Sequence, residues 1–223
     1  MKKFRKKVIP HEGGSQYFRE RRFQFFLSLI KTLPRPIRIL DIGGSNFFWE
    51  KMNFTQMPGI KFTLLNLYPQ EVPGENFTAV VGDATQLPFK DKEFDLVFSN
   101  SVIEHLFTKE NQLKMANEIR RVGNNYFIQT PNLYFPIEPH WLFPFFQFFP
   151  IGVRVFLTQH FNIGGYPKTN NRAKALERVN EVRLLSKKEI TELFPDGNCY
   201  EEKFLSLTKS FVMYRFPKAK EIL

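Results

Sequence analysis

The chain alternates short apolar runs with segments of helical periodicity, and this alternation constrains its fold more than any other feature. Glycine, proline, asparagine or aspartate stands at the ends of the first five apolar runs, as is typical of strands and turns. The predicted strands span residues 37–42, 61–68, 77–81, 95–100, 125–130, 200–207 and 210–216. Because strands that alternate with helices are joined by right-handed crossovers, we expect an α/β fold: a seven-stranded, mostly parallel sheet with helices on both faces. The last two runs lie too close together for a crossover, so they predict an antiparallel C-terminal hairpin at one edge.

Helical spacing is clearest in three segments. Residues 15–33 carry apolar side chains at helical intervals, with Ser15 as the expected N-cap and Pro34 closing the segment. Residues 108–122 form a second predicted helix. Its expected apolar face consists of Leu113, Ala116, Ile119 and Val122. The capping box Ser186-Lys187-Lys188-Glu189 opens a third helix.

Positive charge is concentrated at the start of the chain. Lys and Arg number 32 against 22 Asp and Glu, for a net charge of +10, and residues 1–38 alone hold 11 basic and 2 acidic residues. The remainder is nearly neutral, which argues against a basic face of the kind that binds duplex nucleic acid. Residues 1–14 instead predict a basic arm, either a solvated tail or a segment that contacts anionic lipid or nucleic acid.

The compartment is inferred from three features. A secretory signal is not expected, because the basic start runs into Pro10-His11-Glu12-Gly13-Gly14 instead of an apolar core. The longest apolar stretch, residues 141–157, is interrupted by prolines, a glutamine and an arginine, so it is not expected to span a bilayer. The single cysteine, Cys199, excludes an internal disulfide and a cysteine-based zinc cluster. We therefore expect a cytoplasmic protein, either free or peripheral at the inner membrane face.

Glycine and polar residues follow successive predicted strands at the point where each ends. They are Gly43 and Gly44 after the first strand, Asn66 after the second, Asp83 after the third, and Asn100 with Ser101 after the fourth. In open α/β sheets, ligands bind beyond the carboxyl ends of the strands, where the strand order reverses. If these strands are parallel neighbours, the side chains line one crevice, and the two glycines let the backbone approach a ligand closely.

Several ordered motifs accompany this crevice. They are Leu40-Asp41-Ile42-Gly43-Gly44, Gly82-Asp83-Ala84 followed by Leu87-Pro88-Phe89, Phe94-Asp95-Leu96-Val97, and Ile103-Glu104-His105-Leu106. On these motifs the chain resembles the class I S-adenosylmethionine-dependent methyltransferases over roughly residues 15–216, in particular the type 11-like enzymes with small-molecule or lipid-linked acceptors. The resemblance implies a Rossmann-like fold, S-adenosylmethionine as the cofactor and methyl transfer as the activity.

The resemblance also implies where the cofactor lies. The implied cofactor-binding residues are Asp41, Gly43, Gly44, Ser45, Asn66, Asp83, Ala84, Leu87, Asn100 and Ser101. Gly43 and Gly44 would pass under the methionine part, with Asp41 acting on its amino group through the loop or a water. Asn66, after the second strand, would hold the ribose hydroxyls.

The other half of the implied site binds adenine and the sulfonium. Asp83 would accept from the adenine amino group, the Ala84 N–H would donate to a ring nitrogen, and Leu87 would pack on the adenine face. Asn100 and Ser101 would flank the methyl-sulfonium centre.

Three positions depart from the family pattern. Ser45 and Phe47 stand where the glycine loop usually has small residues, and Asn66 replaces the usual acidic ribose ligand. Asn66 can hydrogen-bond a hydroxyl but carries no charge. These departures leave open a non-catalytic cofactor-binding or interaction module of the same fold. The basic arm leaves open an RNA methyltransferase, with nucleic acid the less favoured partner.

Methyl transfer from a sulfonium is an in-line displacement on an activated donor, so the protein mainly has to align the reacting groups. A base is needed only for a poor nucleophile such as a sugar hydroxyl. The candidate catalytic residues are His140, His105 and Glu138. Each candidate has a structural alternative. His105, with its neighbour Glu104, stands at a helix start and would cap or pack there, whereas His140 and Glu138 stand in a proline-rich turn that they would hold. No metal-binding motif is present, so no metal is expected.

Residues 132–185 lie between the fifth strand and the capping box and are longer than an ordinary loop. We expect them to form an insertion or lid within a single methyltransferase domain of residues 1–223. The centre, residues 141–150, is densely aromatic. These rings either pack on the sheet edge and exclude water, or enter a membrane interface while basic residues meet phosphates. The basic residues are Arg154, Lys168, Arg172 and Lys174. The acceptor is expected to be a small or lipid-linked metabolite, and the protein a monomer or homodimer.

Overall fold

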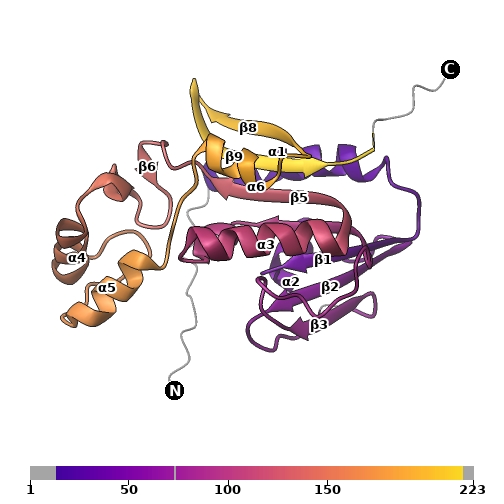
Figure 1. Cartoon of the computed structure of the whole chain (residues 1–223), viewed down its shortest axis with the longest axis horizontal. Coiled ribbons are helices and arrows are strands. Elements are labelled where there is room, and N and C mark those ends of the chain that lie inside the picture. The colour runs from indigo at the N-terminus through magenta and orange to yellow at the C-terminus, as the bar shows by residue number, and fades with distance from the viewer. Residues whose placement is uncertain (1–13, 73, 218–223) are drawn as a thin grey trace.

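The computed structural model describes residues 14–72 and 74–217. Its main feature is a seven-stranded sheet with the order β3-β2-β1-β4-β5-β9-β8 (Figure 1). The strands are β1 (Ile37–Ile42), β2 (Ile60–Asn66), β3 (Phe77–Val81), β4 (Phe94–Asn100), β5 (Gly123–Pro131), β8 (Asn198–Phe204) and β9 (Leu207–Arg215). The neighbours from β3 to β5 pair in parallel, and β9 runs antiparallel to both β5 and β8. The predicted seven-stranded sheet with an antiparallel C-terminal hairpin is confirmed.

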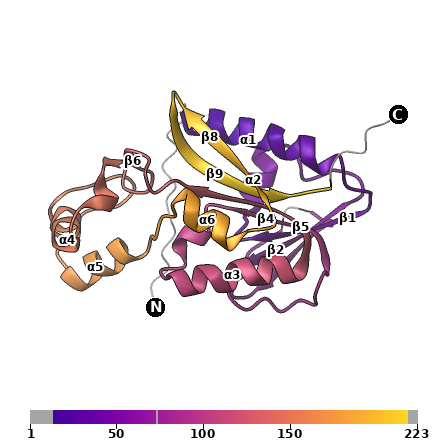
Figure 2. The same cartoon turned by 45° about the horizontal axis from the view of Figure 1, so that its top comes forward.

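Helices cover both faces of this sheet (Figures 1 and 2). They are α1 (Gly14–Ile30) and α2 (Asn46–Lys51) on one face, and α3 (Lys109–Val122) and α6 (Lys187–Leu193) on the other. Successive side chains of a strand point to opposite faces, and this alternation decides which layer each one joins. In β1, Ile37 and Ile39 pack in the cluster with α1, whereas Leu40 and Ile42 pack in the cluster with α3 and α6.

Much of the phenylalanine excess lies in the layer between α1 and the sheet. Phe26 is fully buried, and its ring lies edge-to-face against Phe98 and Phe127 at centroid distances of 5.2 and 5.3 Å. Trp49 of α2 lies 6.1 Å from the same ring. Aromatic pairs of this kind contribute about 0.5–1.5 kcal/mol beyond their buried area. This layer therefore joins α1 and α2 to the centre of the sheet.

The predicted helix ends are partly correct. Thr108 caps α3 by accepting a hydrogen bond from the Asn111 N–H at 3.1 Å. The capping box is also present, with the Ser186 hydroxyl accepting from the Glu189 N–H at 3.3 Å and the Glu189 carboxylate accepting from the Ser186 N–H at 2.9 Å. Ser15 is not an N-cap, because α1 already includes Gly14.

The predicted apolar face of α3 is wrong at one position. Leu113 is 46% exposed, whereas Gln112 and Met115 are fully buried. The inward stripe of the helix lies one residue before Leu113 and continues through Met115 at helical spacing. Gln112 can occupy an inward position because its amide nitrogen donates to the carbonyls of Ile103 and Arg183 at 3.0 and 2.9 Å.

Within residues 14–72 and 74–217, no helix is both long enough and apolar enough to cross a membrane. Residues 1–13 of the predicted basic arm lie outside the described residues. Cys199 lies in β8 and is partly buried.

Between β5 and α6 the chain leaves the sheet and forms an insertion lobe, residues 132–185 (Figure 1). Its elements are β6 (Ile137–Glu138), β7 (Phe143–Pro144), the 3-10 turn η2 (Phe146–Phe148), α4 (Ile151–His160) and α5 (Arg172–Asn180). Trp141 stacks on Phe146 and Tyr166, each at 4.5 Å between ring centroids, in an apolar core separate from the two sheet clusters. Phe145 and Phe148 are about half exposed. The aromatic run therefore divides between the core of the lobe and its surface.

Replacing Phe26 with alanine is expected to lower the free energy of unfolding by about 3–5 kcal/mol, because it leaves a cavity beside Phe98 and Phe127. The matched control is Phe156→Ala on α4, whose ring is about half exposed, with an expected loss of under about 1 kcal/mol. Denaturant unfolding of both variants measures the difference. Equal losses would contradict the central place given to Phe26.

Candidate cofactor and acceptor site

The ends of β1, β2 and β3 lie side by side at one edge of the sheet. The Gly43 N–H donates to the Leu65 carbonyl at 2.8 Å, and the Gly82 N–H donates to the Asn66 carbonyl at 2.9 Å. These bonds extend the parallel pairing past the strand ends, so Gly43 and Asp83 share an edge and are separated only by β2. The strand order reverses between β1 and β4, which is where open α/β sheets bind ligands.

The diglycine bend, Gly43-Gly44, is required by geometry at both positions. Gly43 has a φ of +71°, in the left-handed region that glycine adopts without strain. A Cβ on Gly44 would lie 1.8 Å from Oδ2 of Asp41. The bend therefore closes directly over the Asp41 carboxylate, and any side chain at Gly44 would displace either the bend or the carboxylate.

Asp41 is buried beneath this bend, where its Oδ2 accepts a hydrogen bond from Nε1 of Trp49 at 2.7 Å. Burial disfavours the charged carboxylate and raises the pKa of Asp41 to about 8, while the Trp49 bond acts in the opposite direction. The contacts place the carboxylate as a support under the bend. Its action on a cofactor through the loop stays a prediction.

Two side-chain amides hold the bend, one from the last residue of β2 and one from the loop that follows β2. Asn66 Nδ2 donates to the Gly44 carbonyl, and Gln70 Nε2 donates to the same oxygen at 3.2 Å. An ionised carboxylate has no hydrogen to donate, so an acidic residue could not make this contact at Asn66. The departure from the family pattern thus has a local reason. Gln70 belongs to no motif and was not predicted.

The loop after β3 is built by local hydrogen bonds. Asp83 Oδ1 accepts from the Thr85 N–H at 2.7 Å and from the Thr85 hydroxyl at 2.8 Å. The Asp83 side chain is exposed, whereas Ala84 and Leu87 are buried. A contact with an adenine amino group would therefore use Oδ2 of Asp83. Leu87 is only 4% exposed, so little of its side chain is left to meet an adenine face.

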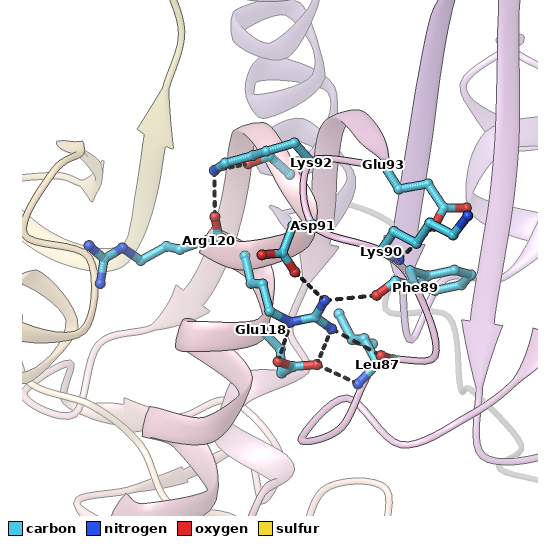
Figure 3. Close-up of polar contacts among 10 residues, drawn as sticks. Leu87, Phe89, Lys90, Asp91, Lys92, Glu93, Glu118 and Arg120 are labelled. Carbon is cyan, nitrogen blue, oxygen red and sulfur yellow. Dashed lines mark hydrogen bonds and ion pairs between the residues drawn. The ribbon is translucent and has the colours of Figure 1, made fainter.

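α3 anchors the segment that follows this loop (Figure 3). The Leu87 N–H donates to Oε2 of Glu118 at 2.7 Å. Arg121 donates from Nη1 to the Phe89 carbonyl at 2.8 Å and from Nη2 to the Leu87 carbonyl at 3.1 Å. Arg121 also pairs with Glu118 and with Asp91. The Leu87-Pro88-Phe89 motif is therefore held as a fixed link between β3 and β4.

A buried ion pair holds the end of β4. Arg22 of α1 donates two hydrogen bonds, of 2.8 and 2.6 Å, to the Glu202 carboxylate of β8, and its Nη1 donates to Oδ1 of Asn100 at 2.6 Å. Ser101 has a φ of +57°, a strained value for serine, and its hydroxyl donates to Oε1 of Gln129 at 2.7 Å. Protein contacts thus fix both residues that are predicted to flank the methyl-sulfonium centre.

Exposed apolar side chains surround the same edge and were not predicted. They are Phe47, Leu67, Tyr68, Val81 and Phe107. They lie at the ends of β2 and β3 or in the segments that follow β1 and β4. Large apolar groups beside convergent polar groups are typical of a ligand-binding cleft.

Glu138, His140 and His105 come together beside β5. Oε1 of Glu138 lies 2.8 Å from Nδ1 of His140, and Oε2 accepts from the His140 and Trp141 N–H groups at 2.7 and 2.6 Å. The rings of His105 and His140 meet edge-to-face at 4.9 Å between centroids. The structure thus brings the three predicted catalytic residues into one cluster, in which Glu138 also holds the turn.

Glu104 joins this cluster from the 3-10 turn η1 (Ile103–His105). It is fully buried, and its Oε2 accepts from the Thr130 hydroxyl at 2.9 Å. Burial raises the pKa of Glu104, and the neighbouring His140 acts in the opposite direction. The Glu104 carbonyl accepts from the Arg183 N–H at 2.7 Å, which joins the turn to the insertion lobe.

A cavity of about 460 Å³ opens between the segment that leads into α3 and the insertion lobe. Its lining includes Phe107, Glu138, Trp141, Arg154 and Arg183. The cavity lies beside the Glu138–His140 pair and not at the diglycine bend. It is therefore a candidate site for an acceptor.

Comparisons with known proteins agree with this geometry. Residues 55–125 match a family model described as a methyltransferase domain. Two uncharacterized proteins of Mycobacterium tuberculosis, from strains CDC 1551 and H37Rv, are each 36% identical to the chain over 56 residues. That match covers 25% of this chain and 19% of each relative, so it spans about a fifth of the relatives' length.

Solved structures share the fold over most of the chain. A Pyrococcus horikoshii protein has a TM-score of 0.53 at 19% identity, with 98% of this chain and all of that chain covered. Magnesium protoporphyrin IX methyltransferase of Synechocystis, solved with bound SAH, has a TM-score of 0.53 at 11% identity. The alignment covers 94% of this chain and 90% of that chain. The chain has the class I methyltransferase fold. The predicted resemblance is confirmed, and the methyltransferase fold and the family match together support S-adenosylmethionine as the cofactor.

The Asp41→Asn variant is expected to gain stability against unfolding, relative to the unchanged chain, as pH rises. The pKa of Asp41 is about 8 in the folded chain and about 3.9 in an unfolded one, so the folded state binds the proton more tightly and stability is lost between these values. The amide has no such proton and still offers an oxygen to Trp49. Thermal unfolding from pH 5 to pH 9 measures the difference in Tm, which should grow up to about pH 8 and then level off. A pH-independent difference would mean that Asp41 titrates in its ordinary range.

Proposed function

We propose that the chain transfers a methyl group from S-adenosylmethionine to a small-molecule or lipid-linked acceptor. The observation that carries this proposal is the alignment of the diglycine bend, Asn66 and Asp83 on the adjacent ends of β1, β2 and β3. The match of residues 55–125 to a methyltransferase family model supports it. A nucleoside-sulfonium has both polar and apolar parts, which suits an edge that carries polar strand ends and exposed apolar side chains.

In this proposal the cofactor lies across the strand ends. Its methionine part lies over the diglycine bend that Asp41 supports from below. The ribose hydroxyls donate to Oδ1 of Asn66, whose nitrogen is committed to Gly44. The adenine lies between Oδ2 of Asp83 and the Ala84 N–H, and the exposed Tyr68 supplies apolar surface near the same strand ends.

The methyl-sulfonium end lies at Asn100 and Ser101. Arg22 and Gln129 fix these two residues, so the donor methyl is oriented by groups that need no rearrangement. Alignment of reacting groups alone supplies effective molarities of about 10⁵–10⁸ M, equivalent to about 7–11 kcal/mol of the barrier. The protein contribution to catalysis is therefore mainly positional.

The acceptor lies in the cavity beside the insertion lobe. For a hydroxyl acceptor, His140 takes the proton as a general base, and Glu138 orients its ring through the 2.8 Å contact at Nδ1. Trp141 and Phe107 provide apolar lining, and Arg154 provides positive charge. This composition suits an acceptor with an apolar body and a polar or anionic group.

Asp83→Ala is expected to weaken the binding of S-adenosylmethionine and of its demethylated product by about 1–3 kcal/mol, or about 5- to 150-fold in Kd, because the adenine amino group loses its acceptor. Asp83→Asn keeps Oδ1 for Thr85 and loses only Oδ2, so it separates the adenine contact from distortion of the loop. The control is Asp91→Ala, a second exposed aspartate, which pairs with Arg121.

Titration calorimetry with all four proteins tests this assignment. Weakened binding in both Asp83 variants and unchanged binding in the Asp91 variant is the expected result. An unchanged Kd in both Asp83 variants would contradict the placement of adenine. If the unchanged chain bound neither S-adenosylmethionine nor its demethylated product, a non-catalytic interaction module would replace the enzymatic proposal.

The surface of the insertion lobe supports an acceptor that is met at an anionic membrane. Its exposed large apolar side chains are Tyr134, Ile137, Leu142, Phe145, Phe148, Ile151, Val153, Phe156, Phe161 and Leu176. Lys168 and Arg172 are exposed on the same lobe, whereas Arg154, which was expected to meet phosphates, lines the cavity instead. Apolar groups that enter the interface and cations that meet anionic headgroups are the two contributions that peripheral binding combines.

The full chain is therefore expected to sediment with vesicles that contain phosphatidylglycerol, and to be released as salt is raised, since each basic residue near the surface contributes about 1 kcal/mol. The double variant Phe145→Ser with Phe148→Ser should bind more weakly. Leu113→Ser, an equally exposed apolar position on α3, is the matched control and should bind as the unchanged chain does. Absence of sedimentation at low salt would contradict membrane contact.

A further inference from the structure

Three side chains with metal-binding atoms converge between η1 and the insertion lobe. One ligand atom each of Glu104, His105 and His140 lies within 4.8 Å of the other two. We infer that these residues form a binding site for a divalent transition-metal ion, with zinc as the reference ion. Two imidazoles and one carboxylate are a donor set that zinc accepts in catalytic sites.

The burial of the Glu104 carboxylate is the observation that most strongly supports a metal site. Its side chain is fully buried, and Thr130 supplies a hydrogen bond to Oε2. Oε1 is buried as well and accepts no hydrogen bond from any described residue. A buried carboxylate oxygen without a partner is costly and calls for a compensating group. A cation held between Glu104 and the two imidazoles supplies that group.

The orientation of His140 suits the same ion. Nδ1 of His140 contacts Oε1 of Glu138 at 2.8 Å, and Glu138 is itself held by the N–H groups of His140 and Trp141. When the neutral ring donates from Nδ1 to this carboxylate, Nε2 carries the lone pair. A carboxylate that fixes the tautomer of a histidine is the usual outer partner of a metal-binding imidazole.

The spacing requires little movement. Ligand atoms bound to one tetrahedral zinc at about 2.0–2.2 Å lie about 3.5 Å apart. Side-chain shifts of about 1 Å therefore close the group around an ion. Three protein ligands leave a coordination position open, as in catalytic and not in structural zinc sites. If the proposed function holds, an oxygen of the acceptor can take that position, because Glu138 also lines the acceptor cavity.

The test uses the full chain, purified without a histidine tag and stripped with a chelator. Titration calorimetry with Zn²⁺, and the absorption spectrum with Co²⁺, should show one ion per chain. Glu104→Gln and His140→Gln should each weaken binding at least tenfold. Glu104→Gln keeps an acceptor for Thr130, and His140 is 15% exposed, so both variants are expected to fold. The matched control is His160→Gln on α4, whose Nδ1 contacts the Phe156 carbonyl and whose loss should leave the affinity unchanged.

Absence of one-to-one binding would overturn the inference, as would equal affinity in the Glu104, His140 and His160 variants. The titration contains no cofactor, and binding of the demethylated cofactor is measured on a separate aliquot. Failure of the metal site and failure of the proposed methyltransferase function therefore give different results.

Discussion

Asp41 carries its carboxylate into the core at the end of β1, and the geometry of the edge where β1, β2 and β3 end depends on where that group lies. Trp49 of α2 donates to it from one side, and the diglycine bend closes over it so tightly that Gly44 has no room for a Cβ. One buried group thus sets the exit of β1, the path of the bend and the position of α2. Because burial makes a charged carboxylate costly, this arrangement is stable only while its partners stay in place.

The opposite side of the site depends on a second buried contact that joins distant parts of the chain. Arg22 lies in the first helix and Glu202 in the penultimate strand, yet together they position Asn100 at the end of β4. Removing either charge would leave the other unpaired in the core, so the two residues stabilise the fold only as a pair. The site therefore becomes complete only when α1 and the C-terminal hairpin have both packed against the sheet. Folding and assembly of the site are coupled for this reason.

The fold was predictable because its signals are local. Strands such as β1 and β3 were predicted with their observed ends, since a short apolar run and its bounding glycine or proline lie next to each other in the sequence. Leu113 was misplaced because periodicity alone gives the inward face of a helix only to within one residue, and the polar Gln112 concealed the true stripe.

Residues of the candidate site at or just after strand ends, such as Asn66 and Asp83, were found by topology. Arg22 and Gln70 were not, because their roles depend on partners that only the folded chain brings close. The grouping of His140 with Glu104 and His105 was not predicted for the same reason, because His140 is distant in the sequence from the other two residues.

The insertion lobe links the chemistry of the acceptor to its access. The same segment provides Glu138, which lines the cavity and contacts His140, and an exposed apolar surface outside the cavity. An acceptor with an apolar body would contact both. At Nε2, His140 can bind a cation or accept a proton, but not both at once. A bound ion would lower the pKa of an acceptor hydroxyl and make an imidazole base unnecessary, whereas without an ion the imidazole of His140 would have to take the proton. Glu138 orients the His140 ring through the contact at Nδ1 whether Nε2 binds a cation or accepts a proton. The choice between the two chemistries therefore depends on Glu104, because a cation would give the buried Oε1 of Glu104 a partner that the described residues do not supply.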